Sequence, residues 1–273
     1  MEASNRARRS TRLSGLLRWA KRLLQGILAV LALSGMAMVP SAEQFFSGRY
    51  LELARALQAK DFAKARELAQ GLDLEVPGRK GMTLMWFAIA NKNFPAVSLL
   101  VTLGSRPDEQ VVQGLGSPLN AALESRELDL LTALLDGGLS PVHTHPQRKL
   151  LLQRAVLSGT PSHVKLLLDR GADVNQRDSV GGSALTEAIS TVQPELALML
   201  VERGANISLP KVNGVTPAWA VQLALQDQVP ASELAVKFAR LRDAMAQRGA
   251  KFPALSPAQM RQQMKAQGLP VAE

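Results

Sequence analysis

Short stretches of apolar residues with helical spacing alternate with turns between residues 50 and 252. In one such unit, residues 150–157 form an apolar stretch, residues 158–160 form a turn, and a second apolar stretch follows at 164–168. Pro161 stands at the start of that second stretch, where a proline is tolerated because the first N–H groups of a helix have no partner within it. The pattern predicts two short helices joined by a turn and followed by a loop.

The unit recurs at a nearly fixed period. One series consists of glycines that close an apolar stretch, at intervals of 34, 33 and 33 residues: Gly104, Gly138, Gly171 and Gly204. A second series marks the start of each unit, at intervals of 34, 33, 33 and 33 residues: Thr83, Ser117, Leu150, Ser183 and Thr216. Gly71 precedes Gly104 by 33 residues, so residues 50–71 are predicted to form a further, more polar unit. Two series in step predict a repeat architecture.

The ends of the units resemble those of a known family. Residues 171–175, Gly-Ala-Asp-Val-Asn, are similar to the end of an ankyrin repeat, and residues 204–208 are a near copy. Thr216-Pro217-Ala218-Trp219 and Ser117-Pro118-Leu119-Asn120 resemble its Thr-Pro-Leu-His opening. Tetratricopeptide repeats have a similar period but lack the element closed by glycine. The resemblance implies an all-α ankyrin-repeat solenoid of stacked helix-turn-helix units, after an N-terminal signal or anchor helix.

We predict four segments along the chain. Residues 1–42 form a signal peptide or membrane anchor, residues 43–80 an N-terminal capping repeat, residues 81–252 the ankyrin repeats, and residues 253–273 a polar tail. The last repeat is irregular, because Gly249 follows Gly204 by 45 residues and an insertion lies near 226–230. We therefore expect a C-terminal cap with an extended first helix or loop, followed by a tail helix around residues 257–267.

The family's histidine is missing from every opening motif. Its positions hold Trp86, Asn120, Gln153, Thr186 and Trp219. In the family this histidine ties neighbouring repeats together through hydrogen bonds, so the sequence predicts that packing carries more of the stability here. We expect the two tryptophans to lie in the core between repeats, with a role as binding anchors as the alternative.

Composition and charge exclude thiol chemistry and argue against nucleic-acid binding. The 273 residues are 47% hydrophobic, contain no Cys and carry a net charge of +9. Without Cys, disulfides, thiolate metal sites and a Cys nucleophile are excluded. Residues 1–42 carry seven basic and one acidic side chain, so most of the net charge lies there. The nearly neutral remainder lacks the basic surface that nucleic-acid binding requires.

The N-terminal segment has the layout of a secretory signal. Residues 23–39 are apolar apart from Gln25 and Ser34, follow an Arg-rich stretch and precede the small residues at 40–42. As a helix the apolar run spans about 25 Å, slightly less than the roughly 30 Å of a hydrocarbon core. Cleavage before Ala42 and retention as an inner-membrane anchor are both open. In either case we expect a periplasmic location and an exported bacterial ankyrin-repeat protein.

Stacking predicts a surface for a protein partner. Equivalent positions, one in each repeat, form a stripe along the concave face: Phe87, Ala121, Arg154, Glu187 and Ala220. Arg154 and Glu187 are expected to face each other, either as part of a binding site or as an exposed ion pair of little consequence. Loop tips supply the other candidate residues: His143, His145, Arg177, Asp178, Lys211 and Asn213.

Catalytic and metal chemistry find little support. His143 and His145 could bind zinc or copper, but no Cys or nearby carboxylate completes a ligand set, so we interpret them as an exposed loop. The sequence contains no Gly-rich phosphate loop, no G-x-S-x-G and no H-E-x-x-H. We predict a monomeric, non-enzymatic protein-binding module with no cofactor. The alternatives are an immunity or accessory protein that neutralises a secreted effector such as a lipase, a periplasmic scaffold for a stress-defence enzyme, and an enzyme with a site at 226–254.

Overall fold

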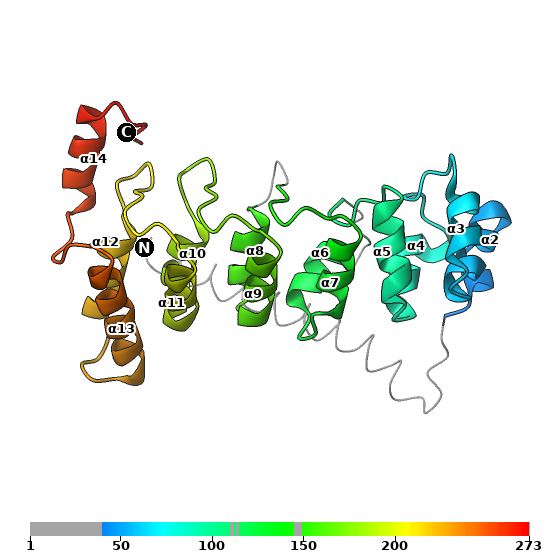
Figure 1. The fold of residues 1–273 in the computed structure, drawn as a ribbon, viewed down its shortest axis with the longest axis horizontal. Coiled ribbons are helices and arrows are strands. Elements are labelled where there is room, and N and C mark those ends of the chain that lie inside the picture. Colours follow the sequence, from blue (N-terminus) through cyan, green and yellow to red (C-terminus); the bar gives the residue numbers. More distant parts are fainter. Residues whose placement is uncertain (1–39, 110–111, 113–114, 145–148, 273) are drawn as a thin grey trace, which may run out of the picture. The chain divides into compact units, whose positions relative to one another are not determined.

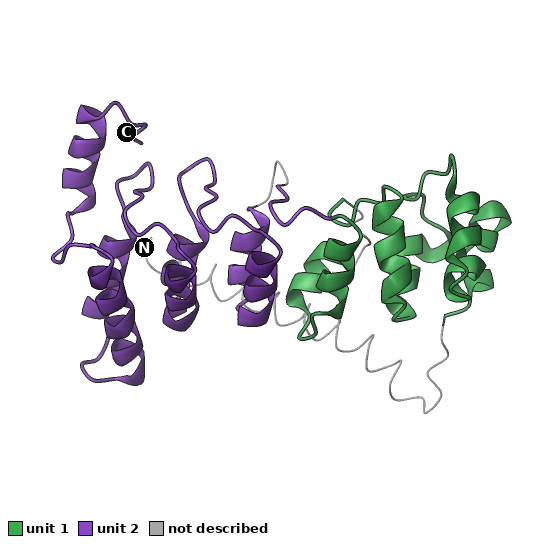
Figure 2. Ribbon diagram, in the orientation of Figure 1, with its two compact units in different colours: residues 1–138 green, residues 139–273 purple. Residues whose placement is uncertain are grey.

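A computed structural model describes residues 40–109, 112, 115–144 and 149–272. These residues form helices and no β-strand, and they divide into two compact units at residues 138 and 139 (Figures 1 and 2). The predicted signal or anchor at 23–39 lies outside the described residues. Among the helices that the structure does describe, none is both long enough and apolar enough to span a membrane. The 33-residue series continues without a break across residues 138 and 139, so the sequence does not reveal the boundary between the units.

The first unit contains three helix pairs. The two helices of each pair pack against each other. Neighbouring pairs also touch, because the first helices α2 and α4 pack together and the second helices α5 and α7 pack together. The pairs are α2 (Gly48–Gln58) with α3 (Phe62–Ala69), α4 (Leu84–Ala90) with α5 (Phe94–Thr102), and α6 (Pro118–Glu124) with α7 (Asp129–Asp136). The described part of this unit also has two short 3-10 helices, η1 (Ala42–Gln44) and η2 (Arg79–Gly81).

The second unit repeats this arrangement and adds a tail helix. Its pairs are α8 (Leu151–Leu157) with α9 (Pro161–Asp169), α10 (Ala184–Ser190) with α11 (Pro194–Glu202), and α12 (Pro217–Gln226) with α13 (Glu233–Gln247). The first helices α8, α10 and α12 pack in sequence, and α11 packs on α13. The tail helix α14 (Pro257–Ala266) lies where the sequence predicts it. The irregular last repeat lengthens both of its helices, to 10 and 15 residues, where α10 and α11 have 7 and 9.

Both sequence series have a local structural cause. The Thr and Ser residues of the second series are helix N-caps, and in α4, α6, α10 and α12 the cap hydroxyl accepts a hydrogen bond from the backbone N–H three residues later. The glycines of the first series follow the second helices with φ between +89° and +108°, a left-handed conformation that other residues adopt at a cost. The period therefore records where helices begin and end.

Side chains also join successive repeats at a fixed spacing. The Asn175 Oδ1 accepts a hydrogen bond from the backbone N–H of Asn206 at 2.6 Å, and the Glu75 Oε1 accepts one from that of Arg106 at 2.9 Å. Each pair is separated by 31 residues. We call such a contact a loop tie. The Asn at the end of the Gly-Ala-Asp-Val-Asn motif thus holds the start of the next loop.

Candidate functional site

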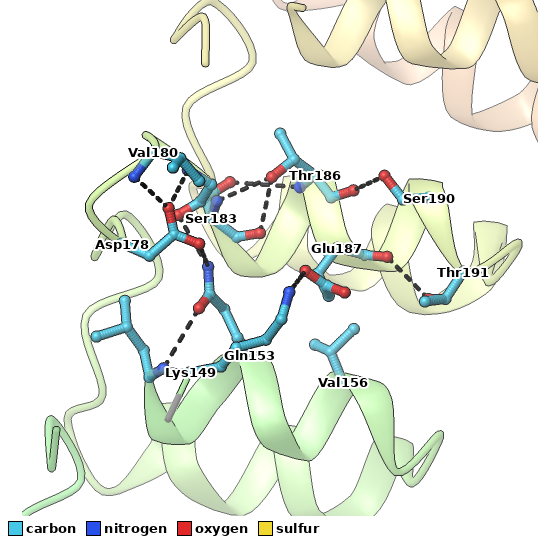
Figure 3. Close-up of polar contacts among 12 residues, drawn as sticks. Lys149, Gln153, Val156, Asp178, Val180, Ser183, Thr186, Glu187, Ser190 and Thr191 are labelled. Atoms are coloured by element: carbon cyan, nitrogen blue, oxygen red, sulfur yellow. Dashed lines mark hydrogen bonds and ion pairs between the residues drawn. The ribbon is translucent and has the colours of Figure 1, made fainter. Parts of the chain in front are cut away.

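A cluster of polar side chains joins two repeats of the second unit. We call it the inter-repeat cluster, and it consists of Lys149, Gln153, Asp178 and Glu187 (Figure 3). Lys149 and Gln153 belong to the repeat of α8, whereas Asp178 lies in the following loop and Glu187 in α10. Because α8 packs on α10, these side chains meet across the contact between two repeats.

Gln153 makes the central hydrogen bonds of the cluster. Its side-chain amide, in a residue that is 1% exposed, donates from Nε2 to the Gly182 carbonyl oxygen at 2.8 Å and to Asp178 Oδ2 at 3.2 Å. Its Oε1 accepts from the Leu150 backbone N–H at 3.3 Å. The sequence prediction that packing replaces the missing histidine needs correction here. Gln153 stands at the histidine position and supplies hydrogen bonds to the next repeat, because an amide both donates and accepts.

Asp178 shapes the loop tip before α10. Its Oδ1 accepts hydrogen bonds from the backbone N–H groups of Gly182 at 2.6 Å and Val180 at 3.1 Å. The Asp178 backbone N–H donates in turn to the Gly182 carbonyl at 2.9 Å. The carboxylate is therefore bonded within its own loop and to Gln153, and it holds the tip in one conformation.

Glu187 forms an ion pair with Lys149. The Glu187 Oε2 lies 2.5 Å from the Lys149 Nζ, and the two side chains are 13% and 45% exposed. The Glu187 carboxylate thus pairs with a residue that the sequence analysis does not single out, because Lys149 precedes α8 (Figure 3). Arg154 itself is 8% exposed. Lys149 is exposed and Glu187 is half-buried, so the ion pair lies at the edge of the contact between the two repeats and is open to solvent on the Lys149 side.

Phe87 does not belong to a binding surface. It is 1% exposed, and its ring lies edge-on to Phe46 with ring centroids 5.5 Å apart. The Phe45 ring lies 6.4 Å from it. The position that is equivalent to Arg154 and Glu187 is buried in this repeat because the segment before α2 covers it. We therefore remove Phe87 from the candidate surface.

The loop-tip candidates of the last repeats are hydrogen-bonded within their own loops and to other parts of the chain. The Arg177 guanidinium donates from Nε to the Gly181 carbonyl at 3.2 Å and contacts the Pro210 carbonyl. The Lys211 backbone N–H donates to the Val215 carbonyl at 2.9 Å. The Asn213 Oδ1 accepts from the Val215 N–H at 3.1 Å, and the Asn213 carbonyl accepts from the Arg261 guanidinium at 2.8 Å.

The two candidate histidines are not both placed. His143 is half-buried and its backbone N–H donates to the Ser140 carbonyl at 3.0 Å, whereas His145 lies outside the described residues. Within the described part of the chain, no three His, Asp or Glu side chains gather as a metal site would require. Of the tryptophans, Trp86 is buried as expected and Trp219 is half-buried.

Comparison with known proteins identifies the fold. No protein-family model matches the chain. Protein phosphatase 1 regulatory subunit 27 of Mus musculus is 36% identical over 85 residues, which is 31% of this chain and 55% of that protein. Its Homo sapiens counterpart is 39% identical over 74 residues, which is 27% of this chain and 48% of that protein. The chain thus spans about half the length of these curated relatives.

Solved structures extend the likeness over most of the chain. The ankyrin repeat domain of Bcl-3 has a TM-score of 0.54 and 22% identity, covering 76% of this chain and 89% of that one. An ankyrin repeat domain from Acinetobacter baumannii has a TM-score of 0.50 and 22% identity, covering 73% of this chain and 98% of that one. The helix pairs, the glycine-closed loops and these likenesses together show that the chain has the fold of an ankyrin repeat domain.

Proposed function

We propose that this chain is a non-enzymatic module that binds a partner protein through its second unit. Ankyrin repeat domains generally mediate protein–protein interaction, and relatives such as the phosphatase regulatory subunits are generally binding modules without catalytic activity. The observation that carries the proposal is the fold itself, because stacked repeats present equivalent positions in line as an extended surface. Function then depends on which side chains occupy that surface.

The partner surface includes Lys149 and Glu187 of the inter-repeat cluster and the loop tips around Arg177, Lys211 and Asn213. The Lys149–Glu187 pair supplies two opposite charges, and 45% exposure of the Lys149 side chain leaves it accessible to a partner carboxylate. Charge pairs at an interface contribute mainly to partner choice and to the association rate. A protein with an acidic patch facing Lys149 fits this surface.

We also propose that the chain works in a bacterial periplasm. The support is the sequence of residues 1–42, where a basic stretch precedes an apolar run. In its narrower form, the partner is a secreted effector such as a lipase, which this chain neutralises as an immunity or accessory protein. A scaffold for a stress-defence enzyme is the alternative that partner identification separates from it. Fractionation of cells expressing the full chain tests the location, and recovery from the cytosol would contradict it.

Affinity purification with matched variants tests the binding surface. The full chain is captured as wild type, as Lys149→Glu and as Lys165→Glu, and the bound proteins are identified by mass spectrometry. Lys165 is the control, because it forms an exposed ion pair on α9, with Asp169 at 3.3 Å. We expect Lys149→Glu to reduce recovery of the partner about tenfold and Lys165→Glu to leave it nearly unchanged.

Thermal unfolding is measured for each variant beside the capture experiment, so that a loss of binding can be distinguished from a loss of folding. Equal recovery with both variants would remove the inter-repeat cluster from the binding surface.

A further inference from the structure

The C-terminal tail lies against the loop tip of the last repeat. We call residues 211–215 the terminal tip and residues 257–272 the tail. The Arg261 guanidinium donates from Nη1 to the Asn213 carbonyl at 2.8 Å, and the Ala272 backbone N–H donates to the Val212 carbonyl at 2.8 Å. Figure 1 shows α14 standing beside the loop that precedes α12. Two carbonyl oxygens of the terminal tip thus accept hydrogen bonds from the tail.

The tail continues a row of contacts that the repeats begin. The Val212 N–H donates to the Val180 carbonyl of the preceding loop tip at 3.1 Å. In the same way the Ala272 N–H donates to the Val212 carbonyl. The tail therefore takes the place that the loop of a further repeat would occupy. The terminal tip offers a backbone acceptor that an extended segment can satisfy, as in other cases of peptide recognition by backbone pairing.

Gly214 makes room for the tail. Its φ is +83°, and a Cβ there would overlap the Pro257 carbonyl oxygen and lie 2.9 Å from the Arg261 Cγ. Gly181, at the same position of the preceding tip, has φ +78°, but a Cβ there would meet the flexible Arg177 side chain and lie 3.2 Å from the Lys211 Cα. Both glycines are needed for the positive φ of the turn. Only Gly214 is also needed because the tail comes too close to leave room for a side chain.

Few contacts hold the tail in place. Within α14, which the structure describes completely, Met264 is the one buried residue. After this helix, Leu269 is 45% exposed although it is apolar. A segment with one buried side chain and a small number of hydrogen bonds is at the low end of local stability, so it opens more readily than the repeats.

We propose that the terminal tip is a peptide-binding site that the tail occupies as an intramolecular ligand and that a partner protein enters by displacing the tail. The ligand class follows from the contacts: a helix whose cationic side chain reaches the Asn213 carbonyl, followed by a non-helical segment whose backbone N–H reaches the Val212 carbonyl. The role of a partner rests on the function proposed above. The occupancy of the tip by the tail rests only on the contacts of Arg261 and Ala272.

A labelled peptide of residues 254–272 tests the site on the full chain. In the wild type the attached tail competes at a local concentration in the millimolar range, so the free peptide binds weakly. Arg261→Ala in the chain weakens its own tail and leaves the tip intact. We expect fluorescence anisotropy to show about tenfold tighter peptide binding to this variant than to the wild type. Arg242→Ala is the control, because Arg242 pairs with Asp243 on α13, and it should behave as the wild type.

Two double variants locate the binding at the terminal tip. Arg261→Ala with Gly214→Ala is expected to lose the peptide, whereas Arg261→Ala with Gly181→Ala is expected to keep it, although both glycine changes strain a turn with positive φ. Equal binding to wild type and Arg261→Ala, or equal binding to both double variants, would overturn the proposal. No partner takes part in this titration, so its failure is distinct from a failure to capture a partner through Lys149.

Discussion

Gln153 shows how one side chain can replace a family feature with different chemistry. The histidine of the ankyrin opening is absent at this position, yet the Gln153 amide reaches the Gly182 carbonyl of the next repeat at 2.8 Å. The same amide accepts from the Leu150 backbone at the start of α8, where the N-cap residue has no side-chain oxygen. One residue therefore accepts from the N–H of the N-cap residue and also supplies the tie to the next repeat.

Replacing Gln153 with Leu should be distinctly destabilising. The Gly182 carbonyl keeps its hydrogen bond from the Asp178 N–H, but the substitution removes the buried Gln153 amide from the Asp178 carboxylate, the Gly182 carbonyl and the Leu150 N–H. The loss of these hydrogen bonds, one of them to a charged group, lowers the free energy of unfolding by about 1–3 kcal/mol. Urea unfolding followed by circular dichroism measures the change. Gln263→Ala, at an exposed position of α14, is the control and should stay within about 0.5 kcal/mol of the wild type. An equally small effect of Gln153→Leu would mean that the amide contributes little to stability.

Helix caps at the start of each repeat set the boundaries of the first helices. The Thr216 Oγ1 accepts a hydrogen bond from the Trp219 N–H at 3.1 Å, and the Thr83 Oγ1 accepts one from the Trp86 N–H at 3.2 Å. The first N–H groups of a helix have no partner within it, so a hydroxyl there stabilises the helix and fixes its first residue. This requirement explains why the series of Thr and Ser positions keeps its period.

Removing one cap tests this account. Thr216→Ala should lower the free energy of unfolding by about 1 kcal/mol, because the Trp219 N–H loses its acceptor at the start of α12. Thr216→Ser retains the hydroxyl and should change stability by less than half as much. Chemical unfolding of the two variants beside the wild type provides the comparison. If the two substitutions have the same effect, the methyl group of Thr216 and not its hydroxyl is what matters.

An ion pair between second helices gives the protein a measurable pH dependence. Hydrogen bonds to the Asp169 carboxylate from Arg203 at 2.8 Å and from Lys165 at 3.3 Å hold the pKa of Asp169 below its ordinary value of 3.8. Because the pKa is lower in the folded state, the stabilisation is present at pH values above 3.8 and is lost as the pH falls through the folded-state pKa. Asp169 is exposed, so the effect is small and is screened by salt.

Asp169→Asn should be less stable than the wild type at pH 7 and equal to it at a pH low enough to protonate the wild-type carboxylate in the folded state. Unfolding by urea at both pH values, each at low salt and at about 1 M salt, measures the difference. The charge-matched control Glu52→Gln removes an exposed carboxylate from α2 and should show a smaller dependence on pH. A difference that persists unchanged at low pH would assign the stabilisation to the side-chain shape and not to its charge.

The repeat pattern was predictable from sequence because each repeated feature is local. A glycine with positive φ and a hydroxyl at a helix start depend on the backbone within a few residues, so they recur wherever a helix begins or ends. The burial of Phe87 was not predictable in this way, since the rings that cover it belong to Phe45 and Phe46 in a non-repeated segment. The Lys149–Glu187 pair and the tail on the terminal tip likewise depend on contacts that occur once, so the 33-residue repeat does not predict them.

Stacked repeats should transmit a local defect only to their neighbours. Phe87→Ala removes a large buried side chain and should destabilise the first unit by about 3–5 kcal/mol. Hydrogen exchange measured helix by helix should then show the largest loss of protection in α2, α4 and α5, because α4 packs on both α2 and α5. A smaller loss is expected in α10 to α13, which belong to the second unit. An equal loss in every helix would instead show that the chain unfolds as one cooperative block.

The loop ties have a consequence for how such a chain changes length during evolution. Asn175 reaches forward 31 residues to Asn206, so this repeat carries the acceptor for its successor's backbone. A duplication of residues 171–203, which span one 33-residue period, would copy both the acceptor and the spacing. The array could then gain whole repeats while each new pair of neighbours keeps the same loop tie. An insertion of any other length would have to be absorbed within a loop or a helix, as the elongated α12 and α13 absorb the irregular last repeat.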